Sequence, residues 1–443
     1  MITILQYPQE VMPVYNTIAF TVDSSNKTNC LFNYICDVYL GATFITRLKL
    51  FPSGTNGYAT FKVNRVLEDL LSFDLQNNLY GASLFALNPN SILHYNLKFG
   101  EEYDTSAQCT AGTTIFPDLI TSDSVMLFEA FNGALQKKEW LEWNFSEYLY
   151  FIDGGGNNLT KFLTTTPEKV LLKYGSQMVW NIFFDGTLDY LEVKTYGVSG
   201  LIQTVTYTNA VANVLNIDMI SVGVGPENLN NSALALGTQP VIHSLVTYYT
   251  IQPFQVGPIP ITANPIRIDI DNRDVKWTPH RLWWLNRLGG FDSYTLTLKD
   301  KREIQISRTE YKRIYGSYKA LIPAVWDYGI EERGRTTMSV NAQEGNTYQS
   351  NYLTELEALW FEILFTSPEV YISDENIRLC YGATVDTGDG FPDPAYLPLL
   401  FESELEPIII KSGSYEEKTK NKVKNINYII EIDKSEAVNI QRN

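Results

Sequence analysis

The sequence is dominated by short runs in which apolar and polar residues alternate, and this pattern restricts the chain to a mainly β fold. Residues 17–22 alternate with a period of two, and residues 24–29 form a polar turn. Further strands are expected at residues 31–40, 44–51 and 58–63. Because turns recur roughly every 8–12 residues, we expect a sandwich or a barrel.

The length of 443 residues predicts several domains, since one domain typically has roughly 100–200 residues. We place an N-terminal β-sandwich with an irregular extension at 1–165 and a second sandwich at 166–262, with the Pro-rich stretch 253–265 as the boundary. An α+β domain with one amphipathic helix is expected at 263–443.

The third region contains the best helix in the sequence, at 353–365. Thr354 is the expected N-cap, and the acidic residues of the first turn suit the positive end of the helix dipole. The expected apolar face consists of Leu356, Leu359, Trp360, Ile363 and Leu364.

Charge argues against a nucleic-acid-binding protein. The chain has 34 Lys and Arg against 50 Asp and Glu, a formal net charge of -16. Neutralising phosphates requires clustered basic residues, so no specific nucleic-acid binding is expected. A negatively charged inner surface is nevertheless compatible with a channel through which DNA passes.

The expected compartment is the cytoplasm of the cell that makes the protein. Residues 1–13 lack the pattern of a signal peptide, and no apolar run approaches the roughly 18–20 residues of a membrane span. The cysteines are too few for a disulfide framework and are expected to be reduced and mostly buried. They are Cys30, Cys36, Cys109 and Cys380.

Catalytic motifs are weak. The three histidines, His94, His243 and His280, have no metal-site spacing, and packing is the expected role of His280 rather than general base. The tripeptide at Asp386 resembles one half of an aspartic protease site, but that chemistry needs two carboxylates. We expect no enzyme, although a non-local carboxylate pair for glycan cleavage stays open as an alternative.

No cofactor is expected, and calcium is the one metal for which the sequence gives any reason. Asp269, Asp271 and Asp274 form one acidic segment, and the loop 386–393 forms another. Neither has the full spacing of a calcium-binding loop, so whether the loop at 386–393 binds calcium stays open.

A basic hairpin is expected near the C-terminus. Its lysines are either solvated or contact an acidic neighbouring subunit, and they are Lys418, Lys420, Lys422 and Lys424.

The most distinctive segment is 281–296, with the sequence RLWWLNRLGGFDSYTL. Trp283 and Trp284 supply a large apolar area, and Gly289 and Gly290 permit a bend with positive φ and close approach of the backbone. Phe291 then begins the next strand. These five residues form either a core corner of their own domain or a contact between subunits.

Segment 281–296 resembles an element of virion proteins from phages that infect Bacteroidetes, including the crAss-like group. Weaker similarity extends to 47–67, 132–136, 162–167, 364–372 and 409–432. The resemblance implies a structural tail or neck protein, either a ring, hub or tail-adaptor subunit, located in the virion. It also implies that the α+β domain expected at 263–443 is tail-tube-like.

Such a subunit would form a cyclic homo-oligomer and bind other virion proteins (portal, ring, hub or tail proteins). The alternatives from other classes are a receptor protein that binds carbohydrate and a glycan-cleaving enzyme.

Overall fold

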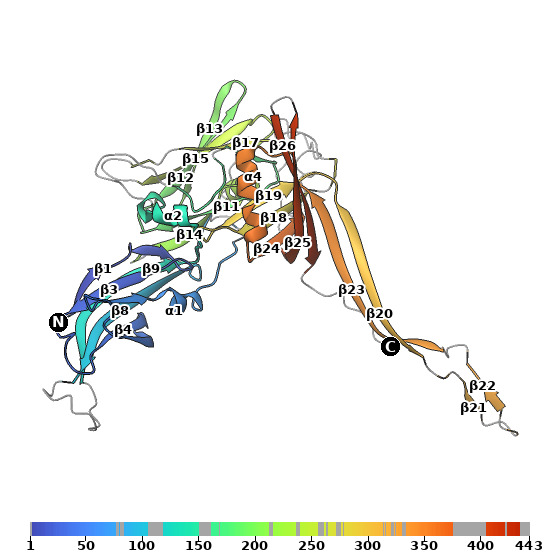
Figure 1. Cartoon of the computed structure of the whole chain (residues 1–443). Helices are drawn as coiled ribbons and strands as arrows, with labels where there is room; N and C mark the ends of the chain where they lie inside the picture. The colour runs from blue at the N-terminus through green and yellow to red at the C-terminus, as the bar shows by residue number, and fades with distance from the viewer. Residues whose placement is uncertain are drawn as a thin grey trace.

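The computed structural model describes most of the chain. The described residues are 2–76, 79, 84–104, 118–149, 161–167, 169–211, 216–235, 240–255, 261–262, 265–271, 276–277, 279–312, 314, 316–319, 323, 325–329, 334–374, 405–420 and 423–434. The fold is mainly β, as the alternating pattern predicts, and its sheets form three bodies (Figure 1).

The N-terminal body is a sandwich of two sheets. One sheet has three strands, in the order β1 (Ile2–Gln6), β3 (Ala19–Ser24) and β6 (Ala59–Lys62). The other has five, in the order β2 (Val11–Pro13), β9 (Asp118–Phe131), β8 (Ile92–Tyr103), β4 (Asn33–Leu40) and β5 (Thr43–Leu50). Buried side chains of β3 alternate with partly exposed ones, so one face of the strand lines the core. The short helix α1 (Asn64–Glu68) follows β6.

The second body also consists of two sheets. The outer sheet runs β10 (Lys169–Leu172), β17 (Ile266–Ile270), β15 (Tyr248–Gln255), β12 (Tyr190–Gly197) and β13 (Gly200–Thr208), with β16 (Ile261–Thr262) paired to β15. The inner sheet runs β11 (Val179–Phe184), β14 (Asp218–Gly223) and β7 (Phe85–Leu87). Helix α3 (Pro226–Ala235) follows β14.

Strand β17 corrects the expected boundary at 262–263. It pairs with β10 and β15, so the second body continues to Ile270. Of the Pro-rich stretch, residues 253–255 belong to β15 and 261–262 to β16, and β16 pairs with β15, so these described residues belong to one sheet and do not separate two domains.

The inner sheet of the second body joins the cores of the molecule. All six side chains of β11 are buried. Trp180, Ile182 and Phe184 pack into the core of the second body, whereas Phe183 belongs to the N-terminal core and Val179 to a smaller core around Trp283. Side chains from both faces of one strand therefore hold neighbouring bodies together.

The third body is a seven-stranded sheet with a helix on one face. Its order is β19 (Phe291–Leu296), β18 (His280–Leu285), β24 (Val370–Asp374), β25 (Glu406–Lys420), β26 (Val423–Lys434), β23 (Arg335–Gln349) and β20 (Lys301–Lys312). Residues between β20 and β23 include the small pair β21 (Ser317–Lys319) and β22 (Val325–Asp327).

The expected helix is present but interrupted. It consists of α4 (Glu355–Phe361) and α5 (Ile363–Thr366), and Thr354 caps α4 in a capping box with Glu357. Trp360, Ile363 and Leu364 are buried as expected, whereas Leu356 and Leu359 are 70% and 59% exposed. The buried face of α4 consists of Ala358, Trp360 and Phe361, so the face that packs against the sheet is rotated from the predicted one.

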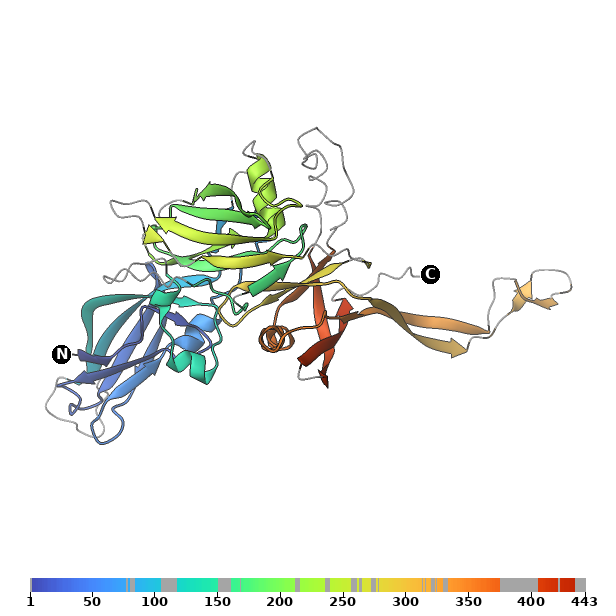
Figure 2. The same ribbon diagram turned by 90° about the horizontal axis from the view of Figure 1, so that it is seen from above.

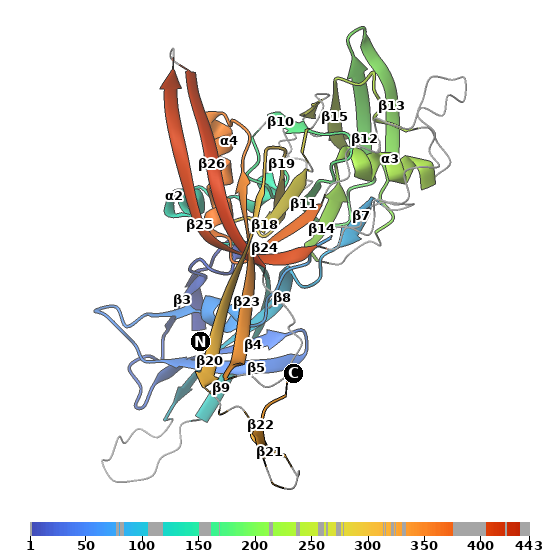
Figure 3. The same ribbon diagram turned by 90° about the vertical axis from the view of Figure 1, so that its right-hand side faces the viewer.

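Two hairpins of the seven-stranded sheet project in opposite directions, as their register shows. Gly345 of β23 pairs with Asp433 of β26, and Gln349 pairs with Ile429. The earlier part of β23 therefore extends past one end of β26, and the earlier part of β26 extends past the end of β23. Figure 3 shows these projections leaving the body on opposite sides, and Figure 2 shows the ribbon of β20 and β23 extending away from the rest of the molecule.

Candidate interaction site

The distinctive segment 281–296 forms a junction inside the chain. Trp283 and Trp284 are 1% and 0% exposed, and Phe291 is 4% exposed. Their side chains lie in two cores, one with β11 and one with helix α4. Because the three rings are buried, they expose no surface to a partner subunit. The structure agrees with the alternative in which they form a core corner of their own domain, and the expectation that they contact another subunit directly is corrected.

The two glycines of the segment permit close approach between the bodies. Gly289 has a φ of 76°, and an added Cβ would lie 2.6 Å from the carbonyl oxygen of Asn132 in the N-terminal body. At Gly290 it would lie 2.7 Å from the carbonyl oxygen of Leu163. The predicted positive φ at Gly289 and close backbone approach are confirmed, but the neighbours belong to the same chain.

Asp292 ties three segments together at this junction. Its carboxylate accepts hydrogen bonds from the hydroxyls of Thr164 and Thr165, from the Asn286 amide at 3.0 Å and from the Trp360 indole at 2.9 Å. Burial raises the pKa of Asp292, and these hydrogen bonds oppose the shift. A fully enclosed carboxylate with this set of donors stabilises the junction and is not accessible to a substrate.

A second polar cluster joins the N-terminal body to the inner sheet. His94 Nε2 lies 2.8 Å from Asp218 Oδ1, and His94 Nδ1 lies 3.5 Å from Glu129 Oε1. The hydrogen bond with Asp218, together with the nearby carboxylate of Glu129, raises the pKa of His94 to about 9. Burial and the neighbouring Glu129 also raise the pKa of Glu10. The cluster is an ionic latch between β8 and β14.

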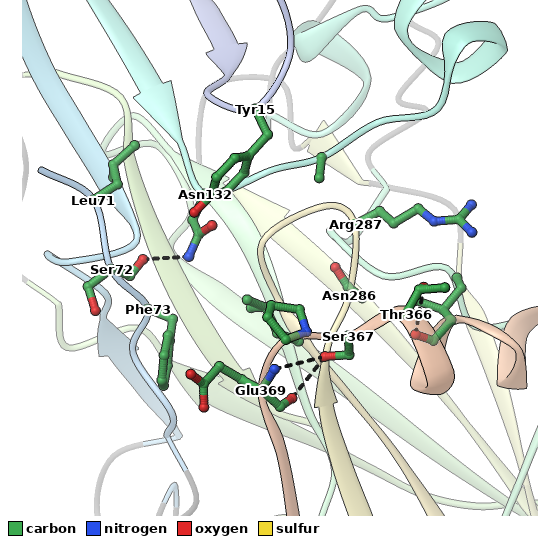
Figure 4. Close-up of a pocket in the computed structure, with 14 residues that line it drawn as sticks. Tyr15, Leu71, Ser72, Phe73, Asn132, Asn286, Arg287, Thr366, Ser367 and Glu369 are labelled. Carbon is green, nitrogen blue, oxygen red and sulfur yellow. Dashed lines mark hydrogen bonds between the residues drawn. The ribbon is translucent and has the colours of Figure 1, made fainter. Parts of the chain in front are cut away.

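A cleft of about 280 Å³ opens where the bodies meet (Figure 4). Among the residues that line it, Tyr15 lies at the top of the view, Phe73 at the left, Arg287 at the right, and Ser367 and Glu369 below. Asn132 donates to the carbonyl of Ser72 at 2.7 Å. Glu369 is the one carboxylate among the residues that line this cleft, whereas glycoside hydrolysis requires a pair.

The longest unsupported feature is the arm, which we define as residues 301–344. All twelve residues of β20 are exposed, and β20 pairs only with β23 among the described strands. The arm leaves the body as a long ribbon with β21 and β22 at its far end (Figure 1). Such a ribbon has no core of its own, and a two-stranded hairpin is marginally stable in water.

Exposed apolar side chains are concentrated on the arm. It supplies nine of the thirty exposed large hydrophobic residues in the described part of the chain, although it is about a tenth of the sequence. They are Ile304, Ile306, Tyr311, Ile314, Tyr318, Val325, Trp326, Tyr328 and Met338. Trp326 and Tyr318 meet edge to face, with ring centroids 5.2 Å apart. Apolar surface of this kind typically marks an interaction site.

The arm also differs from the rest of the chain in charge. Residues 301–344 contain 8 Lys and Arg against 6 Asp and Glu, a formal charge of +2. The basic stretch 418–424 adds four lysines and no acid. The remaining residues carry 22 Lys and Arg against 44 Asp and Glu, or -22. Both projections are therefore positive and the body is strongly negative.

The expected basic hairpin is present as β25 and β26. Lys418 pairs with Asn425, Lys420 with Val423 and Lys424 with Thr419, while Lys422 lies outside the described residues. Lys418, Lys420 and Lys424 lie at the end of the hairpin that extends past β23, so the sheet brings them to a projection. Whether they contact a neighbouring subunit stays a prediction.

The other sequence candidates do not come together in a site. The ring of His280 packs against Tyr348, with centroids 5.0 Å apart, in agreement with a packing role. Asp269 is paired with Arg267 at 2.7 Å and Asp271 with Lys173 at 2.9 Å. Asp274 and the loop 386–393 lie outside the described residues. Among the described residues no group of His, Cys, Asp and Glu could hold a metal ion.

The cysteines depart from expectation at one position. Cys36 is a buried free thiol, as expected. Cys30, however, is disulfide-bonded, and its partner lies outside the described residues. The spacing of the four cysteines gave no signal for this bond. No helix in the described ranges has the length and apolar character needed to cross a membrane.

Comparison with known proteins leaves the chain without an assigned relative. No protein-family profile matches the sequence, and no curated protein matches it significantly.

Proposed function

We propose that this chain is a structural subunit of a bacteriophage tail or neck, a ring or hub component that acts by binding copies of itself and other virion proteins. The observation that carries the proposal is the pair of long hairpins that project in opposite directions from one sheet. Hairpins without support from their own chain gain stability when neighbouring subunits cover them.

The body supports the same function. Its cores meet at a junction that fixes the bodies relative to one another through Asp292, Gly289 and Gly290. A rigid body with extended hairpins suits a closed assembly, in which each subunit has to contact its neighbours at a fixed angle. The similarity of 281–296 to virion proteins of Bacteroidetes phages points to the same class.

Charge favours a place around a DNA path over a DNA-binding role. A strongly negative body repels a polyanion, so DNA would pass such a wall without being held. Two of the arm cations are neutralised locally, since Arg302 is paired with Glu344 and Arg335 with Glu310, and this leaves fewer positive charges to bind phosphate.

The proposal is tested on particles purified from an infected culture. Quantitative mass spectrometry and antibody labelling should find the chain in the particles, in a fixed copy number relative to the portal protein and near the tail or neck. If the chain is abundant in infected cells but absent from particles, the proposal is contradicted.

A glycan array tests the alternative function. The proposal predicts no binding above background. Glycan binding that Tyr15→Ala or Arg287→Ala abolishes would instead favour a receptor protein that uses the inter-body cleft, since aromatic and charged side chains line it. Release of shortened glycans would favour an enzyme.

A further inference from the structure

We propose that the arm of one copy docks on the acidic body of a neighbouring copy of this same chain. The inference rests on the proposed function and deepens it, because it names the partner of the arm. It is carried by the exposure of the arm, by its apolar side chains and by the opposite charges of arm and body.

The length of the arm is sufficient for a contact with a neighbouring subunit. A twelve-residue strand at about 3.3 Å per residue extends on the order of 40 Å, and β21 and β22 lie beyond that. A compact domain of about 100 residues has a radius of gyration of about 13 Å, so the arm can cross most of a neighbouring body.

The area of the arm is sufficient for a stable contact. A two-stranded ribbon about 10 Å wide and about 40 Å long has faces of roughly 400 Å² each. A neighbour that covers both faces would bury roughly 800 Å² on the arm, which is the usual area per partner in a specific complex. Trp326 and Tyr328, 49% and 63% exposed at the far end, are the residue types that anchor such contacts.

Charge complementarity favours the body of another copy as the surface on which the arm docks. Arg308 and Lys312 are exposed on β20 and have no acidic partner among the described residues. The residues outside the arm and the stretch 418–424 have a formal net charge of -22, which favours contact with these side chains, and each copy supplies both the basic arm and the acidic body. The same pairing orients the subunits head to tail, which closes a ring when the rotation fits.

The first experiment reverses the free cations of the arm. The double variant Arg308→Glu, Lys312→Glu should raise the dissociation constant for self-association at least about tenfold in light scattering, without changing the thermal midpoint of the body. The matched control reverses two exposed lysines on helix α2 (Lys137–Leu141), as Lys137→Glu, Lys138→Glu, and should assemble normally. Equal assembly of both variants would overturn the inference.

The second experiment identifies the partner directly. Benzoylphenylalanine replaces Tyr328 in an isotopically light chain, which is mixed with a heavy chain of natural sequence and irradiated. We expect crosslinks from the light arm to body peptides of the heavy chain. Crosslinks confined to peptides of the same chain would show that the arm folds back, and would overturn the inference.

The same crosslinker in virions separates the two proposals. Crosslinks from Tyr328 to a different virion protein, or to DNA, would overturn docking between copies while leaving the virion function intact. A chain missing from particles would remove the proposed function whatever the crosslinks of the purified protein show.

Discussion

Trp283, Trp284 and Phe291 illustrate what residue chemistry predicts and where it stops. The sequence pattern led to the correct expectation of a large apolar corner with a glycine bend, and the bend has the expected geometry at Gly289. The sequence pattern could not show whether the residues that pack against these rings belong to the same chain or to another subunit, because a protein core and a subunit interface use the same residue types. The structure places all three rings inside the chain.

Replacing Gly289 tests the junction at the residue scale. Gly289→Ala should lower the free energy of unfolding by about 2–4 kcal/mol, because its Cβ is strained at positive φ and meets the Asn132 carbonyl. Gly54 is the matched control, with a φ of 69° and nothing within 4 Å of an added Cβ. Gly54→Ala should cost only about 1 kcal/mol in urea unfolding. Equal costs at the two positions would contradict the close contact at Gly289.

The cysteines give a second prediction for single residues. Burial raises the pKa of the Cys36 thiol, so a thiol reagent should leave it unlabelled in the native protein and label it in denaturant. Cys30 should be labelled only after reduction. Peptide mapping by mass spectrometry measures the labelling of each cysteine. Rapid labelling of Cys36 in the native protein would contradict the described packing.

At the scale of elements, strands with clear alternation were predictable and long-range features were not. The strands expected at 31–40 and 44–51 correspond to β4 and β5. Helix α3 was not expected from the sequence, although Pro226 suits the first position of a helix. The arm was missed because a pattern of apolar and polar residues does not show whether a strand lies within the body or projects from it.

The latch between β8 and β14 predicts a dependence of stability on pH. His94 has a folded-state pKa of about 9, above its ordinary value of 6.5, so its contribution is fully present below about pH 6.5 and is lost as the pH rises through 9. Because the side chain is partly exposed, we expect a loss on the order of 1–2 kcal/mol. His94→Gln should flatten this slope in urea unfolding at pH 6 to 9.5. An unchanged slope in the variant would rule out the latch.

At the scale of the whole molecule, the distribution of charge and exposure matters more than any single site. A body of net charge -22 carries positive projections at opposite ends of one sheet, and the arm holds a large share of the exposed apolar side chains. The sequence alone showed the overall negative charge and the lysine hairpin. It could not show the opposite directions of the hairpins, because these follow from the register of β23 on β26.

The central claim, that the chain works by assembling with copies of itself, is tested most directly by the mass and symmetry of the purified full-length protein. Light scattering combined with negative-stain imaging should show a closed ring of several copies, with the arms reaching adjacent subunits and with assembly that weakens at high salt. A monomer that persists at high protein concentration and low salt would contradict the account.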